Sequence, residues 1–241
     1  MSDAAEDPRV VAIYDALDPD RSDLDVYVAV AEELGAHRVL DVGCGTGTFA
    51  LLLADRGLDV TGVDPSSASL AVAQAKPRAE RVRWIHGDAT ALPPLRVDPA
   101  TMTANVAQAI VDDASWEGTL RGVFDALRPG GHLVFETRDP AYEAWREWNR
   151  DASYGVTEIE GVGAVESWVE VTEVRLPLVT FRGTCLFASV GEALTTDSTL
   201  RFREREEVRA ALVSQGYVVD GLRGAPDRPG RELVFFARRP E

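Results

Sequence analysis

Cysteine and histidine, from which metal sites and disulfide frameworks are built, are scarce in this sequence. Among its 241 residues are two cysteines and three histidines. Neither Cys44 nor Cys185 stands in a metal-ligand spacing such as CxxC. We therefore expect no metal site and no disulfide framework, and we interpret Cys185 as a small buried strand residue.

Positive charge is also in short supply. Lys and Arg total 25 against 40 Asp and Glu, which gives a net charge of −15, and Lys76 is the only lysine. A surface of this sign repels phosphate backbones, so we expect no nucleic-acid partner. We interpret the lone lysine as a compositional habit and not as a functional signal.

Long apolar runs are missing too. No run reaches the ~20 apolar residues that a membrane helix needs, and the opening stretch MSDAAEDPRV is polar and acidic. We expect a soluble, cytoplasmic protein with no membrane partner. A hydrophobic content of 45% suits one large or two small domains with a substantial core.

The first part of the chain alternates short apolar runs with longer amphipathic ones. This pattern predicts a mostly parallel sheet with helices on both faces. The expected strands are 38–43, 58–64, 82–88, 100–106 and 131–137, and the expected helices are 26–34, 48–56, 67–76 and 115–131.

After Pro140 the pattern changes. Residues 141–149 favour a short aromatic helix, and residues 156–200 alternate apolar with polar residues, which is typical of antiparallel strands with one wet face. A helix at 203–216 and strands at 217–222 and 231–239 return to the earlier style. We predict one domain over 1–241 that carries a β-rich insertion at 141–200.

The stretch VLDVGCGTGTFA, residues 39–50, places Gly43, Gly45 and Gly47 between a strand and a helix. Glycine allows a tight turn there and a close approach of a ligand to the backbone N–H groups at the helix start. Dinucleotide-binding folds use G-x-G-x-x-G, which requires glycine at position 48. Thr48 stands there, so the spacing is G-x-G-x-G.

This loop resembles the first motif of the class I S-adenosylmethionine-dependent methyltransferases. Three further segments match in order: Asp64 in GVDPS, Asp88 in GDA, and LRPGGHLVFET at 127–137. The resemblance implies a Rossmann-like, doubly wound α/β fold with a seven-stranded, mostly parallel sheet and an antiparallel β insertion after strand five. It also implies S-adenosylmethionine as cofactor, S-adenosylhomocysteine as product, and an N-terminal helical lid at 1–35.

The resemblance also implies a set of cofactor contacts. The glycine loop would pass the methionine moiety, with an acid before it that orients the loop or contacts the amino group. The acid after the second strand would bind the ribose, and the GDA turn would hold adenine. The residues carried over are Tyr14, Asp41, Gly43, Cys44, Gly45, Asp64, Pro65, Ser66, Asp88, Ala89, Asn105 and Val106.

Each acid also has a plainer interpretation. Asp41 could cap the turn without touching a ligand, and Asp64 and Asp88 taken singly would be ordinary surface acids. Their joint placement at the ends of consecutive strands, where α/β folds bind ligands, favours a binding site.

No general base stands out, and the catalytic residue stays unknown. His37 and His132 fall at the opposite end of their strands, and we interpret His86 as structural. Such a reaction depends mainly on holding donor and acceptor in line.

Substrate contacts are expected after the fourth and fifth strands. Gln108 follows the fourth, and Arg138 follows the fifth, where it could bind a substrate anion or pair with Glu136 or Asp139. Trp145 and Trp148 share a helical face and would either cap the substrate or cover the core.

The leading hypothesis is a methyltransferase acting on an oxygen or nitrogen of a small molecule. A non-catalytic cofactor-binding or partner-binding protein is the alternative, and an NAD(P)-dependent oxidoreductase is disfavoured by Thr48. The insertion would be a substrate cap or a dimer interface, so a homodimer is left open.

Overall fold

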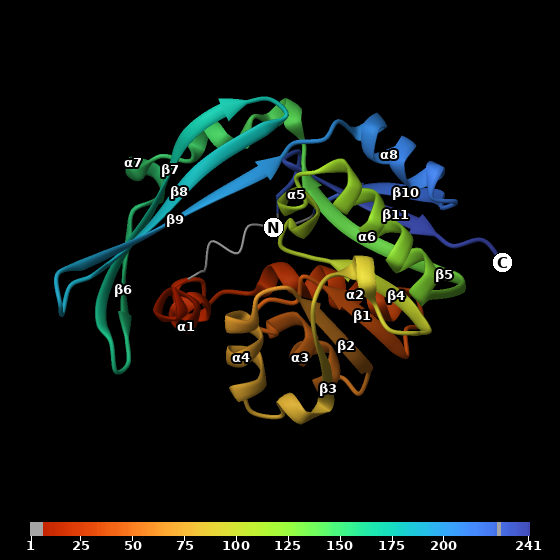
Figure 1. Ribbon diagram of the computed structural model, residues 1–241, viewed down its shortest axis with the longest axis horizontal. Helices are drawn as coiled ribbons and strands as arrows, with labels where there is room; N and C mark the ends of the chain where they lie inside the picture. The colour runs from red at the N-terminus through yellow and green to blue at the C-terminus, as the bar shows by residue number, and fades with distance from the viewer. Residues whose placement is uncertain (1–6, 226–227) are drawn as a thin grey trace.

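The computed structural model describes residues 7–225 and 228–241 and shows two sheets (Figure 1). The main sheet has seven strands in the order β10-β11-β5-β4-β1-β2-β3, and the second has four in the order β6-β7-β8-β9. Strands β1 to β5 are parallel, while β11 runs antiparallel to β5 and to β10. The predicted α/β fold with a β insertion after strand five is confirmed.

The strands of the main sheet and the helices that connect them come from both ends of the chain. Their bounds are α1 Pro8–Leu17, α2 Asp25–Glu33, β1 Arg38–Val42, α3 Thr48–Asp55, β2 Asp59–Asp64, α4 Ser67–Ala75, β3 Val82–His86, β4 Val97–Met102, α5 Val106–Ala109, α6 Asp113–Ala126, β5 Leu127–Arg138, α8 Arg205–Ser214, β10 Val218–Gly224 and β11 Glu232–Arg238.

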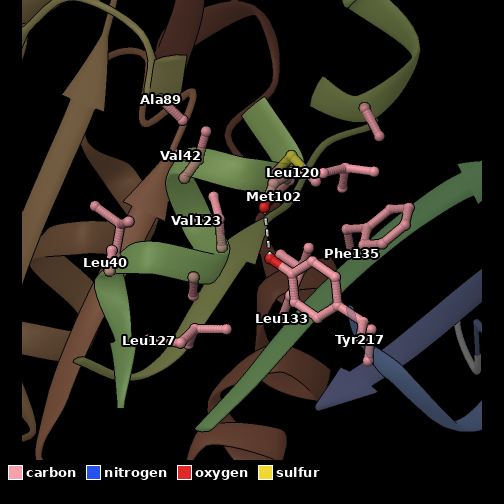
Figure 2. Packing of buried hydrophobic residues seen from close by; sticks show 14 of the residues in the cluster. Leu40, Val42, Ala89, Met102, Leu120, Val123, Leu127, Leu133, Phe135 and Tyr217 are labelled. Carbon is pink, nitrogen blue, oxygen red and sulfur yellow. Dashed lines mark hydrogen bonds between the residues drawn. The ribbon is translucent and has the colours of Figure 1, made fainter. Parts of the chain in front are cut away.

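Helices cover both faces of the main sheet because its strands are apolar on both sides. Leu40 of β1 packs in one cluster with α6 and α8, and its neighbour Val39 packs in another with α2 and α3. Figure 2 shows the first cluster, in which the Tyr217 hydroxyl donates to the Leu120 carbonyl at 2.8 Å. Because both faces of the sheet are buried, a ligand can reach the sheet only at the ends of the strands.

The insertion forms the second sheet and three short helical segments. Its strands are β6 Gly155–Ile159, β7 Gly163–Arg175, β8 Leu178–Phe187 and β9 Glu192–Arg201, and its helical segments are η4 Pro140–Tyr142, η5 Ala144–Glu147 and α7 Arg150–Ser153. In Figure 1, α1 lies between β6 and α4, and it contacts both. The insertion therefore joins the main domain partly through the N-terminal helix.

Three expected elements differ from the structure. The fourth strand ends at Met102, because Ala104 and Asn105 adopt left-handed backbone angles. Helix α6 ends at Ala126, because the next residue already pairs with β4. The expected helix at 141–149 is two 3₁₀ turns, separated by Glu143 at φ +52°. Across the described residues, no helix is long and apolar enough to cross a membrane.

Candidate functional site

The glycine loop between β1 and α3 has backbone angles that explain its composition. Gly43, Gly45 and Gly47 have φ values of +71°, +52° and +80°, in the left-handed region that glycine enters without cost. The N–H groups of Gly43 and Cys44 donate to the Val63 carbonyl at 2.8 and 3.1 Å. These bonds hold the loop over the carboxyl end of β2.

The three glycines differ in what surrounds them. A Cβ on Gly43 would lie 2.6 Å from Val106, and one on Gly47 would lie 2.5 Å from the Trp84 ring. A Cβ on Gly45 would have no described atom within 4 Å. Two glycines are thus required by packing, while the third faces open space where a ligand can approach the loop.

Asp64 ends β2 beside this loop and is 7% exposed. Its Oδ2 accepts from the Gly45 N–H at 2.8 Å, and its Oδ1 accepts from the Ser66 N–H at 2.8 Å. Burial raises the pKa of Asp64, and these two hydrogen bonds oppose part of the rise. Each carboxylate oxygen keeps capacity for another donor, such as a hydroxyl group. Pro65, beside it, offers its carbonyl to His86 Nε2 at 3.0 Å.

Asp41, in β1, is 1% exposed. Its Oδ1 accepts a long hydrogen bond of 3.4 Å from Thr101, and its Oδ2 has no partner among the described residues. Burial, and secondly the nearby charge of Asp64, raise the pKa of Asp41 to about 7. An unpartnered buried carboxylate oxygen costs free energy, which a donor or cation from a ligand would recover.

The GDA turn follows β3. The Asp88 side chain accepts from the N–H of Thr90 at 2.8 Å and from its hydroxyl, so it caps the short turn that follows. Ala89 is buried, and a Cβ on Gly122 of α6 would lie 1.8 Å from the Ala89 carbonyl oxygen. Helix α6 therefore fixes the turn tightly.

The segment after β4 has a strained backbone, and two buried glutamates hold it by hydrogen bonds. Ala104 and Asn105 have φ values of +55° and +60°, unfavourable for residues with a Cβ. Glu136 Oε1 accepts from the Asn105 N–H at 3.0 Å, and Glu232 Oε1 accepts from Asn105 Nδ2 at 3.3 Å. A carboxylate can only accept, so the amide nitrogen must face Glu232. Asn105 Oδ1 then has no partner among the described residues.

Gln108 and Arg138 form one unit. Gln108 is 1% exposed, and its Oε1 accepts from both the backbone N–H and Nη1 of Arg138 at 3.2 Å. Arg138 lies 3.9 Å from Glu232, and no ion pair with Glu136 or Asp139 is present among the described residues. Burial lowers the pKa of Arg138, and Glu232 opposes this. Gln108 thus orients Arg138. The side-chain carbonyl of Gln108 is already occupied by these two hydrogen bonds.

The two tryptophans have different surroundings. Trp145 is 7% exposed and packs edge-on against Phe202, with ring centroids 4.6 Å apart. Trp148 packs against Phe181 at 5.0 Å and carries the Arg138 guanidinium 5.3 Å from its ring. Both rings also pack with Phe202 in one apolar cluster, so the core interpretation describes both, and Trp148 lies beside the Arg138 unit as well.

Tyr14 of α1 is 52% exposed. Its neighbour Asp15, which the motif comparison did not single out, accepts from the Thr46 hydroxyl of the glycine loop at 2.7 Å. Asp15 also pairs with Lys76 at 2.5 Å. The sequence marks Lys76 only as the lone lysine, and no sequence pattern pointed to this contact. Glu232 was likewise missed, because it begins a strand more than ninety residues beyond its site partners.

Residues 39–131 match the family model described as "Methyltransferase domain". Over these residues the chain is similar to methyltransferase domains. The demethylmenaquinone methyltransferase of Thermus thermophilus is 37% identical over 111 residues, which cover 44% of this chain and 50% of that protein. The chain spans about half the length of the curated relatives it matches.

Solved methyltransferase structures share the whole fold. The CcbJ methyltransferase of Streptomyces caelestis superimposes with a TM-score of 0.78 and 21% identity, covering 96% of each chain. The sugar N-methyltransferase KedS8 of Streptoalloteichus sp. gives a TM-score of 0.73 and 23% identity over 92% of this chain and 88% of its own. The matched methyltransferase domain contains the glycine loop, Asp64, Asp88 and Asn105. Arg138 and the insertion lie beyond it.

Proposed function

We propose that the protein is an S-adenosylmethionine-dependent methyltransferase that methylates an oxygen or nitrogen of a small molecule. The arrangement at the ends of β1 and β2 carries this proposal. Gly45 leaves open space above the loop, Asp64 lies beside it, and Asp41 Oδ2 is buried without a described partner. These features fit a ligand that has ribose hydroxyls at one end and an ammonium group at the other.

In this proposal each residue has a distinct task. Asp64 accepts the ribose hydroxyls, Asp88 and Ala89 hold adenine, and Asp41 compensates the ammonium group. Tyr14, Cys44, Pro65, Ser66 and Val106 line the same region. Bound S-adenosylmethionine supplies a sulfonium-borne methyl group to a nucleophile. The protein contributes orientation and exclusion of water, which in favourable cases lower a barrier by ~7–11 kcal/mol.

One face of the second sheet packs with α1 and with Trp145, and this face also has room for the acceptor. Cross-strand pairing puts Val169, Gly183 and Thr196 in one row. This row belongs neither to the apolar cluster around α1 nor to that around Trp145. Of the atoms in the described residues, a Cβ on Gly183 would meet only the Thr196 carbonyl, at 3.9 Å. We propose that this row and Trp148 face the acceptor and that the insertion acts as its cap. The alternative, a homodimer interface, stays a prediction.

The test is transfer of a labelled methyl group from S-adenosylmethionine to a panel of small amines, alcohols and phenols, followed by mass spectrometry of the products. We expect a methylated amine or hydroxyl product with the wild type and none with Asp64→Ala. Binding of S-adenosylmethionine without transfer to any member of a broad panel would favour a non-catalytic binding protein. Displacement of S-adenosylmethionine by NAD would instead favour an oxidoreductase.

A further inference from the structure

One carboxylate of the N-terminal helix collects hydrogen bonds from the glycine loop. Asp15 Oδ1 accepts from the hydroxyls of Thr46 at 2.7 Å and of Thr48 at 3.2 Å. Lys76 Nζ pairs with Asp15 Oδ2 at 2.5 Å and donates to Thr48 Oγ1 at 3.1 Å. We call these four residues the Asp15 network.

The donors and acceptors of the Asp15 network are consistent with one another. Lys76 can only donate, so Thr48 accepts from it and gives its own hydrogen to Asp15. Thr46, which is 6% exposed, also donates to Asp15. Burial raises the pKa of Asp15, but the bonds from Lys76, Thr46 and Thr48 outweigh it and leave the pKa lowered. The carboxylate is therefore charged near neutral pH, as its partners require.

The same helix is seated on the insertion by its apolar side. Ile13 is 3% exposed and packs with Val165, Cys185 and Phe187 of the second sheet. Figure 1 shows α1 between β6 and α4. Two residues of one helix, two positions apart, thus contact different parts of the molecule: Ile13 contacts the insertion and Asp15 contacts the glycine loop.

We infer that Asp15 is a positioning residue that fixes the glycine loop for cofactor binding and makes that binding depend on the seating of α1. This inference rests on the proposed function, since it concerns the affinity of the same loop. A loop already held by hydrogen bonds loses less conformational freedom when a ligand binds. Loss of the Asp15 contacts should therefore weaken cofactor binding and speed cofactor release.

Helix α1 offers a matched control. Arg9 of α1 pairs with Glu192 of β9 at 2.8 Å, and both side chains are about half exposed, so Glu192→Gln removes a surface ion pair of the same helix and leaves the seating by Ile13 and the glycine loop in place. Because Lys76 is the only lysine, acylation by an N-hydroxysuccinimide ester followed by peptide mass spectrometry reports on one side-chain amine. The release of Lys76 can thus be followed without any ligand.

The experiment measures affinity and dissociation rate of S-adenosylhomocysteine, thermal stability and Lys76 acylation for wild type, Asp15→Asn and Glu192→Gln. We expect Asp15→Asn to raise the Kd about ten-fold, the effect of losing one net hydrogen bond, mostly through faster dissociation. Its Lys76 should be acylated faster, and Glu192→Gln should match wild type in Kd. Lys76→Arg, which keeps the cation, should retain most of the affinity.

The outcomes separate the inference from the proposed function. Equal affinities for wild type and Asp15→Asn overturn the inference and leave the proposed function intact. A wild type that does not bind S-adenosylhomocysteine contradicts the proposed function, and with it the inference. If Asp15→Asn does not fold, Thr46→Val gives the same comparison, because it removes the loop hydroxyl that donates to Asp15 and keeps the carboxylate. An unchanged Kd in Thr46→Val would also overturn the inference.

Discussion

Asp41 and Asp64 belong to the neighbouring strands β1 and β2, and the charge of Asp64 adds to the effect of burial on Asp41. The two carboxylates differ in how far their hydrogen-bonding capacity is satisfied. Asp64 receives two backbone N–H groups at 2.8 Å, while Asp41 Oδ2 receives none from the described residues. An acid pair with one member unsatisfied is suited to a ligand that carries positive charge.

This relationship predicts a pH dependence of ligand affinity. The pKa of Asp41 is raised to about 7, and only the charged form attracts an ammonium group. The affinity for S-adenosylhomocysteine should rise with pH through about 7 and fall by up to about ten-fold per pH unit below it. Calorimetry across this range checks the prediction. Asp41→Asn should bind more weakly and show a flat profile, and a flat wild-type profile would contradict the assignment.

The same pKa predicts a stability effect of opposite sign. Between the usual pKa of 3.8 and about 7, the folded protein holds a proton on Asp41 that the unfolded chain lacks. The free energy of unfolding therefore falls as pH rises from 3.8 to about 7 and levels off above about 7. Asp41→Asn should raise Tm above this pH, with a gain on the order of 1 kcal/mol or more, about 2–4 °C for each kcal/mol. Scanning calorimetry should find little gain near pH 4, and an equal gain at all pH values would refute the mechanism.

The glycines of the loop should respond differently to a methyl group. In Gly45→Ala the new Cβ occupies the open space proposed for the ligand, so we expect a folded protein that no longer binds S-adenosylhomocysteine. Gly191→Ala is the matched control, since it has φ +66° and no described atom within 4 Å, but lies in the β8–β9 turn. Both variants should lose about 1–2 kcal/mol of stability from the left-handed backbone. Retained binding in Gly45→Ala would place the ligand elsewhere.

The strained segment after β4 should gain stability from glycine. Ala104 is exposed and has φ +55°, so Ala104→Gly relieves a conformation that costs alanine about 1–2 kcal/mol, offset in part by greater freedom of the unfolded chain. We expect a small rise in the free energy of unfolding, measured with urea. Ala210→Gly, exposed within α8, should lower it by about 1 kcal/mol. A loss of similar size in Ala104→Gly would show that the strain is absent.

The sequence predicts those parts of the fold whose cause is local. Helix α3 and strand β2 match their expected ranges within a residue, because buried apolar runs and glycine turns define them. The end of β4 was misplaced because the left-handed turn at Asn105 is held by Glu136 and Glu232, which lie far along the chain.

The residues of the candidate site also fall into those that a local motif predicts and those that depend on distant contacts. The glycine loop and Asp64 could be placed by their motif, since strand ends bring them together in this fold. The contacts of Asp15 with Thr46 and Lys76 depend on how α1 docks, and no local pattern encodes that docking. Trp145 was open to two interpretations, and its packing against Phe202, the residue after β9, depends on how the end of the second sheet returns to the main domain.

Calorimetric titration of S-adenosylmethionine tests the central claim most directly, with wild type, Asp64→Ala and Asp59→Ala compared and NAD as competitor. Asp59 is exposed at the start of β2, and Asp64 ends the same strand, so the two variants remove equal charge from opposite ends. The account predicts saturable binding that NAD does not displace, that Asp59→Ala leaves unchanged, and that Asp64→Ala weakens about ten-fold or more. Equal binding by Asp64→Ala and wild type, or no binding by the folded wild type, would contradict it.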